Sequence, residues 1–146
     1  MNLLKLRAVA DAMASLSKDP STQVGAIVVD DDANILTTGY NGFPRGVKDH
    51  DYRYKDRDEK LKFVSHAEAN AIAQAARLGA KLHGSTMILT SLYPCSNCAK
   101  LIIQAGIKKV YAPKMSRQER NFHWFQEAKI SETMFNEAGV EVEVYE

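Results

Sequence analysis

The chain has 146 residues, a formal net charge of +1, 45% hydrophobic residues and 25% charged residues. This balance is typical of an ordinary soluble globular protein, and the length predicts one domain over residues 1–146. The near-neutral charge provides no overall field that would attract nucleic acid or an anionic membrane, so neither is an expected partner.

The N-terminal segment carries Lys5, Arg7 and Asp11 among its apolar residues. Charges at these positions are unlike a signal peptide or a membrane-spanning helix, so we expect a cytoplasmic protein. In a reducing compartment, Cys95 and Cys98 are expected to be free or bound to a metal rather than joined in a disulfide.

Helical spacing of apolar residues predicts an amphipathic helix over residues 2–16, which ends before the Asp19-Pro20 pair. The β-branched run Val24–Val29 and the segment Ile35–Thr38 flank an acidic turn. Together they predict a β-hairpin.

A turn-rich loop over residues 39–46 leads into a strongly charged stretch. Residues 47–62 hold six Lys or Arg and five Asp or Glu residues. This stretch is a long connection, and long ordered connections in compact domains tend to be functional.

The second half of the chain alternates helices with strands. The expected helices are 66–78, 95–105 and 117–137, with glycine stop signals at Gly79, Gly106 and Gly139. The expected strands are 87–90, 109–112 and 140–144. Because helices separate these last three strands, we expect them to pair in parallel, within a mixed five-stranded sheet covered by helices.

Two short motifs carry the candidate chemistry. His66-Ala67-Glu68 and Pro94-Cys95-Ser96-Asn97-Cys98 each lie at the start of an expected helix. Two thiolates and an imidazole are good zinc ligands, and three protein ligands leave the fourth position for a water whose pKa zinc lowers to about 7. We therefore expect His66, Cys95 and Cys98 to bind zinc and Glu68 to transfer protons.

Each motif alone has another interpretation. Ser65 and Glu68 fit a capping box, which would need no catalysis. A lone Cys-x-x-Cys also occurs in redox pairs and in structural zinc sites. A structural site would need a fourth ligand, for which the chain offers His50, His83 and His123. The two motifs together match the H-x-E…P-C-x-x-C signature of zinc nucleobase deaminases, which favours a catalytic site.

Over about residues 8–112, the chain resembles the deoxycytidylate (dCMP) deaminases of the cytidine deaminase superfamily. The zinc motifs, within His66–Ile72 and Pro94–Gly106, are shared by the superfamily, whereas Ser17–Ala26 and Gly39–Pro44 point to the dCMP deaminases. The resemblance implies an α/β, three-layer cytidine-deaminase-like fold, in a single CMP/dCMP-type deaminase domain over residues 1–146.

The resemblance also implies a reaction and a substrate site. The reaction is the hydrolysis of dCMP to dUMP and ammonia, which supplies dUMP for dTMP synthesis. Backbone N–H groups near Ala67 and Cys95 would contact the base, and Asn41 would contact the sugar. Asn41-Gly42 is also simply a good turn pair. Candidates for the phosphate are Lys18, Ser21, Lys114 and Arg117.

Regulation is implied in the same way. The family is typically a homo-hexamer that dCTP activates and dTTP inhibits, both with Mg²⁺. The segment that resembles its effector site contains Gly42, Phe43, Arg45 and Gly46. Its glycines permit close backbone approach, and Arg45 can meet phosphate charge.

Two features depart from the family pattern. Some members hold a second, structural zinc with further cysteines, but Cys95 and Cys98 are the only cysteines here, so we expect one zinc per chain. The segment after Lys114 adds aromatic bulk in Phe122, Trp124 and Phe125, which we expect to be core or oligomer contacts.

Three other functions stay open from the sequence. The first is the same chemistry on dCTP, CMP, cytidine, a nucleobase or tRNA adenosine, although the lack of a basic stripe weakens the tRNA option. The second is a non-catalytic nucleotide-binding zinc module, in which Glu68 would have no role. The third is a redox protein that uses Cys95 and Cys98, which the adjacent His-x-Glu motif disfavours.

Overall fold

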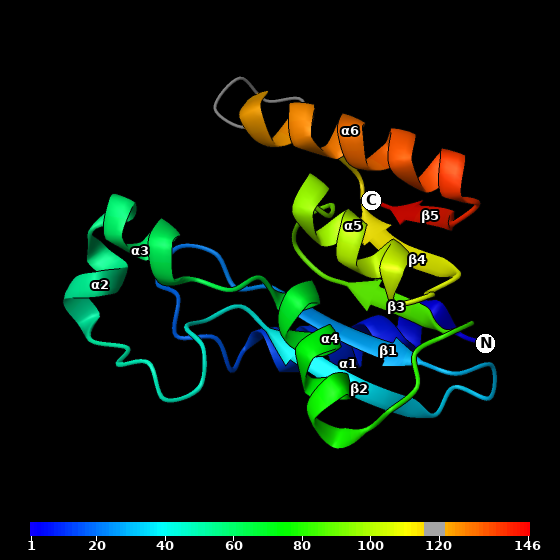
Figure 1. Cartoon of the computed structure of the whole chain (residues 1–146), viewed down its shortest axis with the longest axis horizontal. Helices are drawn as coiled ribbons and strands as arrows, with labels where there is room; N and C mark the ends of the chain where they lie inside the picture. The colour runs from blue at the N-terminus through cyan, green and yellow to red at the C-terminus, as the bar shows by residue number, and fades with distance from the viewer. Residues whose placement is uncertain (116–121) are drawn as a thin grey trace.

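The computed structural model describes residues 1–115 and 122–146 (Figure 1). Its elements are α1 (Leu3–Ala14), β1 (Gly25–Val29), β2 (Ile35–Tyr40), α2 (Asp51–Lys55), α3 (Arg57–Phe63), α4 (Ala67–Leu78), β3 (Thr86–Leu89), α5 (Ser96–Gln104), β4 (Lys109–Pro113), α6 (Phe122–Ala138) and β5 (Glu141–Tyr145). The predicted helices and strands are confirmed to within a few residues, except that the start of the expected helix 117–137 lies outside the described residues.

The strands form one mixed sheet in the order β2-β1-β3-β4-β5. Strand β1 pairs antiparallel with β2 and with β3, whereas β3, β4 and β5 pair in parallel. The expected hairpin and the expected parallel pairing of the last three strands are both confirmed. The parallel pairing follows from the helical crossovers α5 and α6, because each returns the chain to the end of the sheet at which the previous strand began.

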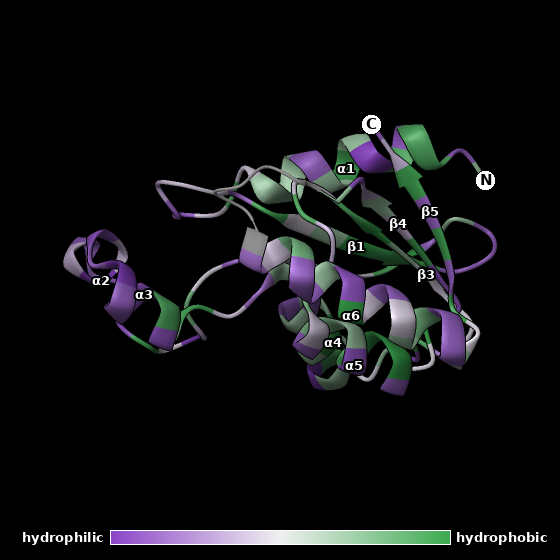
Figure 2. Cartoon of the chain, turned by 90° about the horizontal axis from the view of Figure 1, so that it is seen from above, coloured by the Kyte–Doolittle hydropathy of each residue, from purple (hydrophilic) through white to green (hydrophobic). Residues whose placement is uncertain are grey.

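Helices cover both faces of the sheet, so the molecule has three layers. Helix α1 lies on one face, and α4, α5 and α6 lie on the other (Figure 2). In β1, Ala26 and Val28 pack in the core beneath α4 to α6, while Ile27 and Val29 pack in the core beneath α1. Because successive side chains of a strand point to opposite faces, a strand covered on both sides is apolar at every position, as β1 is.

Helix α4 lies unusually close to strand β2. A Cβ atom at Gly39 would lie 2.4 Å from the backbone oxygen of Ala67 and 2.5 Å from the backbone nitrogen of Ala71. The hydroxyl of Thr37 donates to the backbone oxygen of Ala71 at 2.8 Å. The absent side chain at Gly39 therefore allows the close approach that fixes the first turn of α4 against the sheet.

Residues 43–64, which we call the arm, project from the body of the molecule (Figure 1). The arm covers the charged connection expected from the sequence, and the structure shows two short helices within it, α2 and α3. The Asp56 side chain caps α3 by accepting from the backbone N–H groups of Asp58 and Glu59. Asp is a favoured N-cap residue, so a charged stretch without helical apolar spacing still forms a helix here.

Backbone hydrogen bonds close the base of the arm, and an aromatic contact packs its interior. At its base, the backbones of Gly42 and Ser65 exchange two hydrogen bonds, of 3.1 and 2.8 Å. Within the arm, the ring of Phe43 stacks on that of Tyr54 with 4.4 Å between ring centroids. This pairing places Ser65, the residue before His66, next to Gly42, the residue after Asn41.

Among the described residues, no helix combines the length and the apolar character needed to cross a bilayer.

Candidate metal centre and active site

The two motifs meet at the N-termini of two helices. His66 is the N-cap residue of α4 and Cys95 is the N-cap residue of α5, and neither side chain caps its helix. Both side chains are therefore free to face each other, and Cys98, one turn into α5, completes the group. One ligand atom from each of His66, Cys95 and Cys98 lies within 4.8 Å of the other two.

The spacing of these atoms suits a zinc ion. Nδ1 of His66 lies 3.5 Å from Sγ of Cys95 and 3.4 Å from Sγ of Cys98. Zinc bonds of about 2.0–2.1 Å to nitrogen and about 2.3 Å to sulfur, at a tetrahedral angle, separate the two ligand atoms by about 3.6 Å. The donor set and its spacing therefore fit one tetrahedral zinc held by three protein ligands.

The cluster has three protein ligands, whereas a structural zinc site would have four. Within the described part of the chain, no fourth His, Cys, Asp or Glu joins the cluster of His66, Cys95 and Cys98. Both cysteines are free and buried, without a disulfide. The three alternative ligands considered from the sequence, His50, His83 and His123, lie in described segments and are not part of the cluster.

The capping-box interpretation of Ser65 and Glu68 is wrong. The N-cap is His66, and the backbone N–H of Ser65 donates to Gly42 rather than to Glu68. Glu68 occupies the first turn of α4 with only 5% of its surface exposed. The Glu68 carboxylate bonds to its own backbone N–H and to Cys98 rather than to Ser65, so it lies against the cluster of ligand atoms.

The side chains around the centre shift one another's pKa values. The hydrogen bond with Cys98 lowers the pKa of the Cys95 thiol, and the His66 contact acts in the same direction. The same Cys95 bond, together with burial, raises the pKa of Cys98. Burial also raises the pKa of Glu68 above its ordinary range, which suits a group that must both accept and release a proton near neutral pH.

A pocket opens beside this centre. His66, Ala67 and Glu68 line one part of it, with Leu92 and Trp124 forming apolar wall. The Trp124 ring lies 5.8 Å from the His66 ring, centroid to centroid. Trp124 thus lines the pocket, whereas the sequence had suggested that it makes a core or oligomer contact.

Asn41 also lines the pocket, and its amide organises the segment that precedes β1. Its Oδ1 accepts from the backbone N–H of Val24 at 2.9 Å, and its Nδ2 donates to the backbone oxygen of Thr22 at 2.9 Å. The structure therefore shows a bracing role for Asn41 and places it beside the expected base-binding region.

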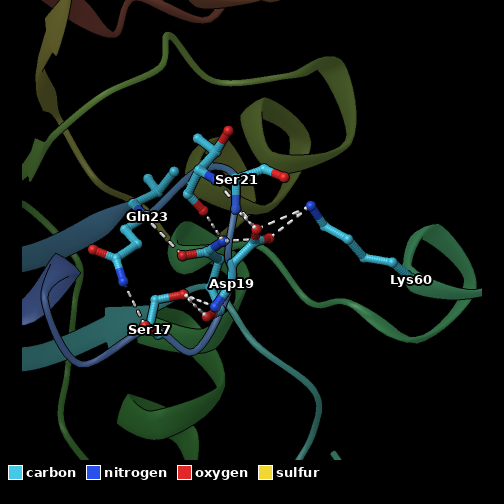
Figure 3. A network of polar contacts seen from close by, with 8 residues as sticks. Ser17, Asp19, Ser21, Gln23 and Lys60 are labelled. Atoms are coloured by element: carbon cyan, nitrogen blue, oxygen red, sulfur yellow. Dashed lines mark hydrogen bonds and ion pairs between the residues drawn. The ribbon is translucent and has the colours of Figure 1, made fainter. Parts of the chain in front are cut away.

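The sequence analysis missed an ion pair that borders the same pocket. Lys60 of the arm reaches Asp19, with its Nζ 2.9 Å from Oδ2 of the carboxylate (Figure 3). Asp19 had been treated only as part of a helix stop and Lys60 only as one charge in the arm. A signal was present, because Asp19 belongs to the Ser17–Ala26 segment that carries the family resemblance.

The expected phosphate-binding residues are placed elsewhere or cannot be placed. Lys18 is exposed and pairs with Asp49 at 2.6 Å, and Ser21 is exposed. Lys114 is exposed and pairs with Glu146 at 3.5 Å. None of these three lines the pocket beside the metal centre. Arg117 lies outside the described residues.

The expected effector segment borders a second hollow, between the loop after β2 and helix α4. Gly42, Phe43 and Arg45 line it, whereas Gly46 does not. The guanidinium of Arg45 donates to the side-chain oxygen of Gln74. This hollow is separate in its lining residues from the pocket at the metal centre.

One face of α6 holds the loop that carries Cys95. Trp124 donates from Nε1 to the backbone oxygen of Tyr93 at 2.9 Å, and the Ser131 hydroxyl donates to the backbone oxygen of Pro94 at 2.8 Å. Between them, Glu127 accepts from the backbone N–H and the hydroxyl of Ser96, at 3.2 and 2.7 Å. Residues three and four apart share a helix face, so α6 holds the loop at consecutive points.

Comparison with known proteins agrees with this site. Residues 2–114 match the model of the cytidine and deoxycytidylate deaminase zinc-binding region. The chain belongs to this deaminase family. The match spans both motifs, so the cluster of His66, Cys95 and Cys98 lies within the zinc-binding deaminase region.

Individual relatives extend the similarity over most of the deaminase chain. This chain is 42% identical to an uncharacterized deaminase of Aliivibrio fischeri, over 92% of its own length and 86% of the relative. It is 41% identical to the human deoxycytidylate deaminase, over 91% of this chain and 73% of the relative. The dCMP deaminase of cyanophage S-TIM5, solved in complex with dCMP and dUMP, superposes with a TM-score of 0.72 at 31% identity, covering 97% of this chain and 95% of the other. The three-layer cytidine-deaminase-like fold is confirmed.

We predict that Glu127→Ala weakens zinc retention by about fivefold, because the segment after Cys95 loses two hydrogen bonds to a carboxylate. The measurement is the zinc dissociation constant of the purified protein against a competing chelator. Glu137→Ala is the matched control, since it makes the same change on an exposed residue of the same helix. Equal zinc affinity in Glu127→Ala and the control would contradict a role for α6 in positioning the loop.

Proposed function

We propose that this deaminase hydrolyses dCMP to dUMP and ammonia and so supplies dUMP for dTMP synthesis. The observation that carries the proposal is the buried carboxylate of Glu68 beside a three-ligand zinc centre at the side of a pocket. The choice of dCMP rests on the human relative, named as a deoxycytidylate deaminase, and on the cyanophage enzyme bound to dCMP and dUMP.

The residues divide the chemistry between them. His66, Cys95 and Cys98 hold the zinc, which when bound supplies a water that ionises near neutral pH. Glu68 accepts a proton from the water that attacks C4 of the cytosine ring and delivers it to N3. A second transfer through Glu68 moves the proton of the new C4 hydroxyl to the departing amine, as the bond between C4 and nitrogen breaks and the C4 oxygen becomes a carbonyl.

The pocket walls position the base and the sugar in this proposal. Backbone N–H groups at the starts of α4 and α5, near Ala67 and Cys95, contact the base. Leu92 and Trp124 provide apolar surface against its ring. Asn41 Oδ1 uses one lone pair to accept from Val24, and its second lone pair can accept from a sugar hydroxyl.

We further propose that dCTP activates and dTTP inhibits the enzyme, each with Mg²⁺, and that it assembles as a homo-hexamer. The family resemblance motivates both proposals. The hollow lined by Gly42, Phe43 and Arg45 supports the first, because an exposed guanidinium beside open backbone suits a triphosphate. Gly46, whose φ of +82° favours glycine, shapes the loop just beyond it.

Glu68→Gln is expected to lower kcat for dCMP by at least about 100-fold, because an amide cannot accept and release the proton. Ammonia release is measured from dCMP, CMP, dCTP, deoxycytidine and guanine, and dCMP should give the highest kcat/KM. Glu137→Gln, an exposed site on α6, is the control. Near wild-type activity in Glu68→Gln would refute the mechanism, and a preference for another substrate would refute only the choice of dCMP.

Metal analysis of the active protein is expected to give one zinc per chain. Removing the zinc with a chelator should abolish dCMP deamination, and adding one equivalent should restore it, because the three ligand atoms converge on one position. Cys98→Ser should lower the bound zinc in the same analysis. Two zinc ions per chain, or full activity without zinc, would contradict the proposed site.

Titration of dCTP or dTTP, each with Mg²⁺, into the dCMP assay should raise or lower activity respectively. Arg45→Ala should weaken both responses, because it removes a cation from the hollow at the loop after β2. Arg57→Ala, an exposed arginine elsewhere on the arm, is the control and should respond as wild type. Unchanged kinetics with both nucleotides would reject the regulatory proposal.

A further inference from the structure

Lys60 is the feature of the pocket that the mechanism above does not use. It lies in α3 of the arm, and its extended side chain spans the space between the arm and the segment before β1 (Figure 3). Its Nζ lies 3.0 Å from Oδ1 and 2.9 Å from Oδ2 of Asp19. The Lys60 side chain is 13% exposed and that of Asp19 is 2% exposed, so this pair is largely removed from water.

The Lys60 ammonium has a donor to spare. A lysine ammonium carries three N–H groups. Both partners of the Lys60 ammonium are oxygens of the one Asp19 carboxylate, and the described residues supply it no other hydrogen-bond acceptor. Lys60 also lines the pocket that contains His66 and Glu68, so a bound ligand can reach the remaining N–H.

Lys60 is not the only donor that stabilises the buried carboxylate of Asp19. Its Oδ1 also accepts from the backbone N–H groups of Ser21 and Thr22, at 2.8 and 3.1 Å. Its Oδ2 lies 3.4 Å from the amide nitrogen of Asn41. Burial alone would raise the pKa of Asp19, but the Lys60 bond and the two backbone bonds outweigh burial and lower it. Because backbone donors also satisfy the carboxylate, Asp19 does not require every N–H group of Lys60, and the ammonium keeps a donor for a ligand.

No other lysine or arginine among the described residues lines this pocket. In the proposed pose the base lies at His66 and Glu68 and the sugar at Asn41, so a cation that lines the same pocket is the candidate partner for the phosphate. Lys18 and Lys114, which the sequence had suggested, are both exposed and engaged with other carboxylates outside the lining.

We propose that Lys60 binds the 5′-phosphate of the nucleotide substrate while it remains paired with Asp19, and so makes the enzyme prefer a nucleoside monophosphate over the free nucleoside. This proposal rests on the proposed deamination of dCMP. Asp19 acts as a positioning residue, because it holds the Lys60 ammonium at the pocket. The arm thereby contributes to substrate choice through one side chain.

A purely structural ion pair between the arm and the body would behave differently. Loss of a structural contact disturbs the pocket for every substrate, whereas loss of a phosphate contact affects only substrates that carry a phosphate. The preference for dCMP over deoxycytidine, expressed as the ratio of their kcat/KM values, separates the two roles.

The test compares wild type with Lys60→Gln. We expect kcat/KM for dCMP to fall by about 10- to 100-fold, the size of a lost charge-assisted hydrogen bond, and that for deoxycytidine to change by less than about twofold. Lys62→Gln is the matched control, since it makes the same charge change on an exposed residue of the same helix, and it should leave both values unchanged. Calorimetric binding of dCMP and deoxycytidine in the Glu68→Gln background gives the same comparison without turnover.

A second variant addresses the buried carboxylate that Lys60→Gln leaves without its cation. Asp19→Asn combined with Lys60→Gln removes both charges, and the double variant should show the same loss of preference for dCMP. Retention of the wild-type preference in both variants, or an equal loss on dCMP and deoxycytidine, would overturn the assignment of Lys60. A wild-type protein that deaminates neither compound, or both equally well, would instead overturn the proposed substrate.

Discussion

The candidate active site depends on the meeting of two helix N-termini. His66 and Cys95 occupy the N-cap positions of α4 and α5, where Ser, Thr, Asp or Asn side chains ordinarily bond to the first N–H groups of a helix. Here neither side chain makes such a bond, and each helix forgoes about 1 kcal/mol of capping. In return, the ligand atoms face each other, and the positive ends of two helix dipoles favour the thiolate form of the cysteines.

Contacts from distant parts of the chain keep these helix ends in place. Gly39 lets α4 approach β2 closely, and the backbone exchange between Gly42 and Ser65 leads directly into His66. On the other side, Glu127 and Ser131 of α6 hold the residues on either side of Cys95. The site is therefore only as well ordered as the packing of α4 and α6, which explains why a metal centre of three side chains needs a complete three-layer fold around it.

A second polar network connects the pocket with the arm. Asp19 receives hydrogen bonds from its own loop and from Lys60 of the arm, while Asn41, which follows β2, bonds to Val24 of the same loop. Burying a carboxylate without hydrogen-bond donors destabilises the fold, so such a network is stable only when all of its members are hydrogen-bonded together. The loop before β1, the turn after β2 and the arm consequently share one set of hydrogen bonds at the edge of the pocket.

Much of this protein was determined by local sequence. The alternation of apolar runs with helical spacing predicted nearly every strand and helix, and the paired motifs predicted the metal ligands and the proton carrier, because each depends on residues close together in the chain. Tertiary structure decided the rest. It showed that Ser65 does not cap α4, that the charged connection forms two helices, and that Trp124 borders the pocket. It also joined Asp19 to Lys60 across 41 positions. No local pattern reports such a contact, because its energy exists only once the arm folds back over the loop and removes both charges from water.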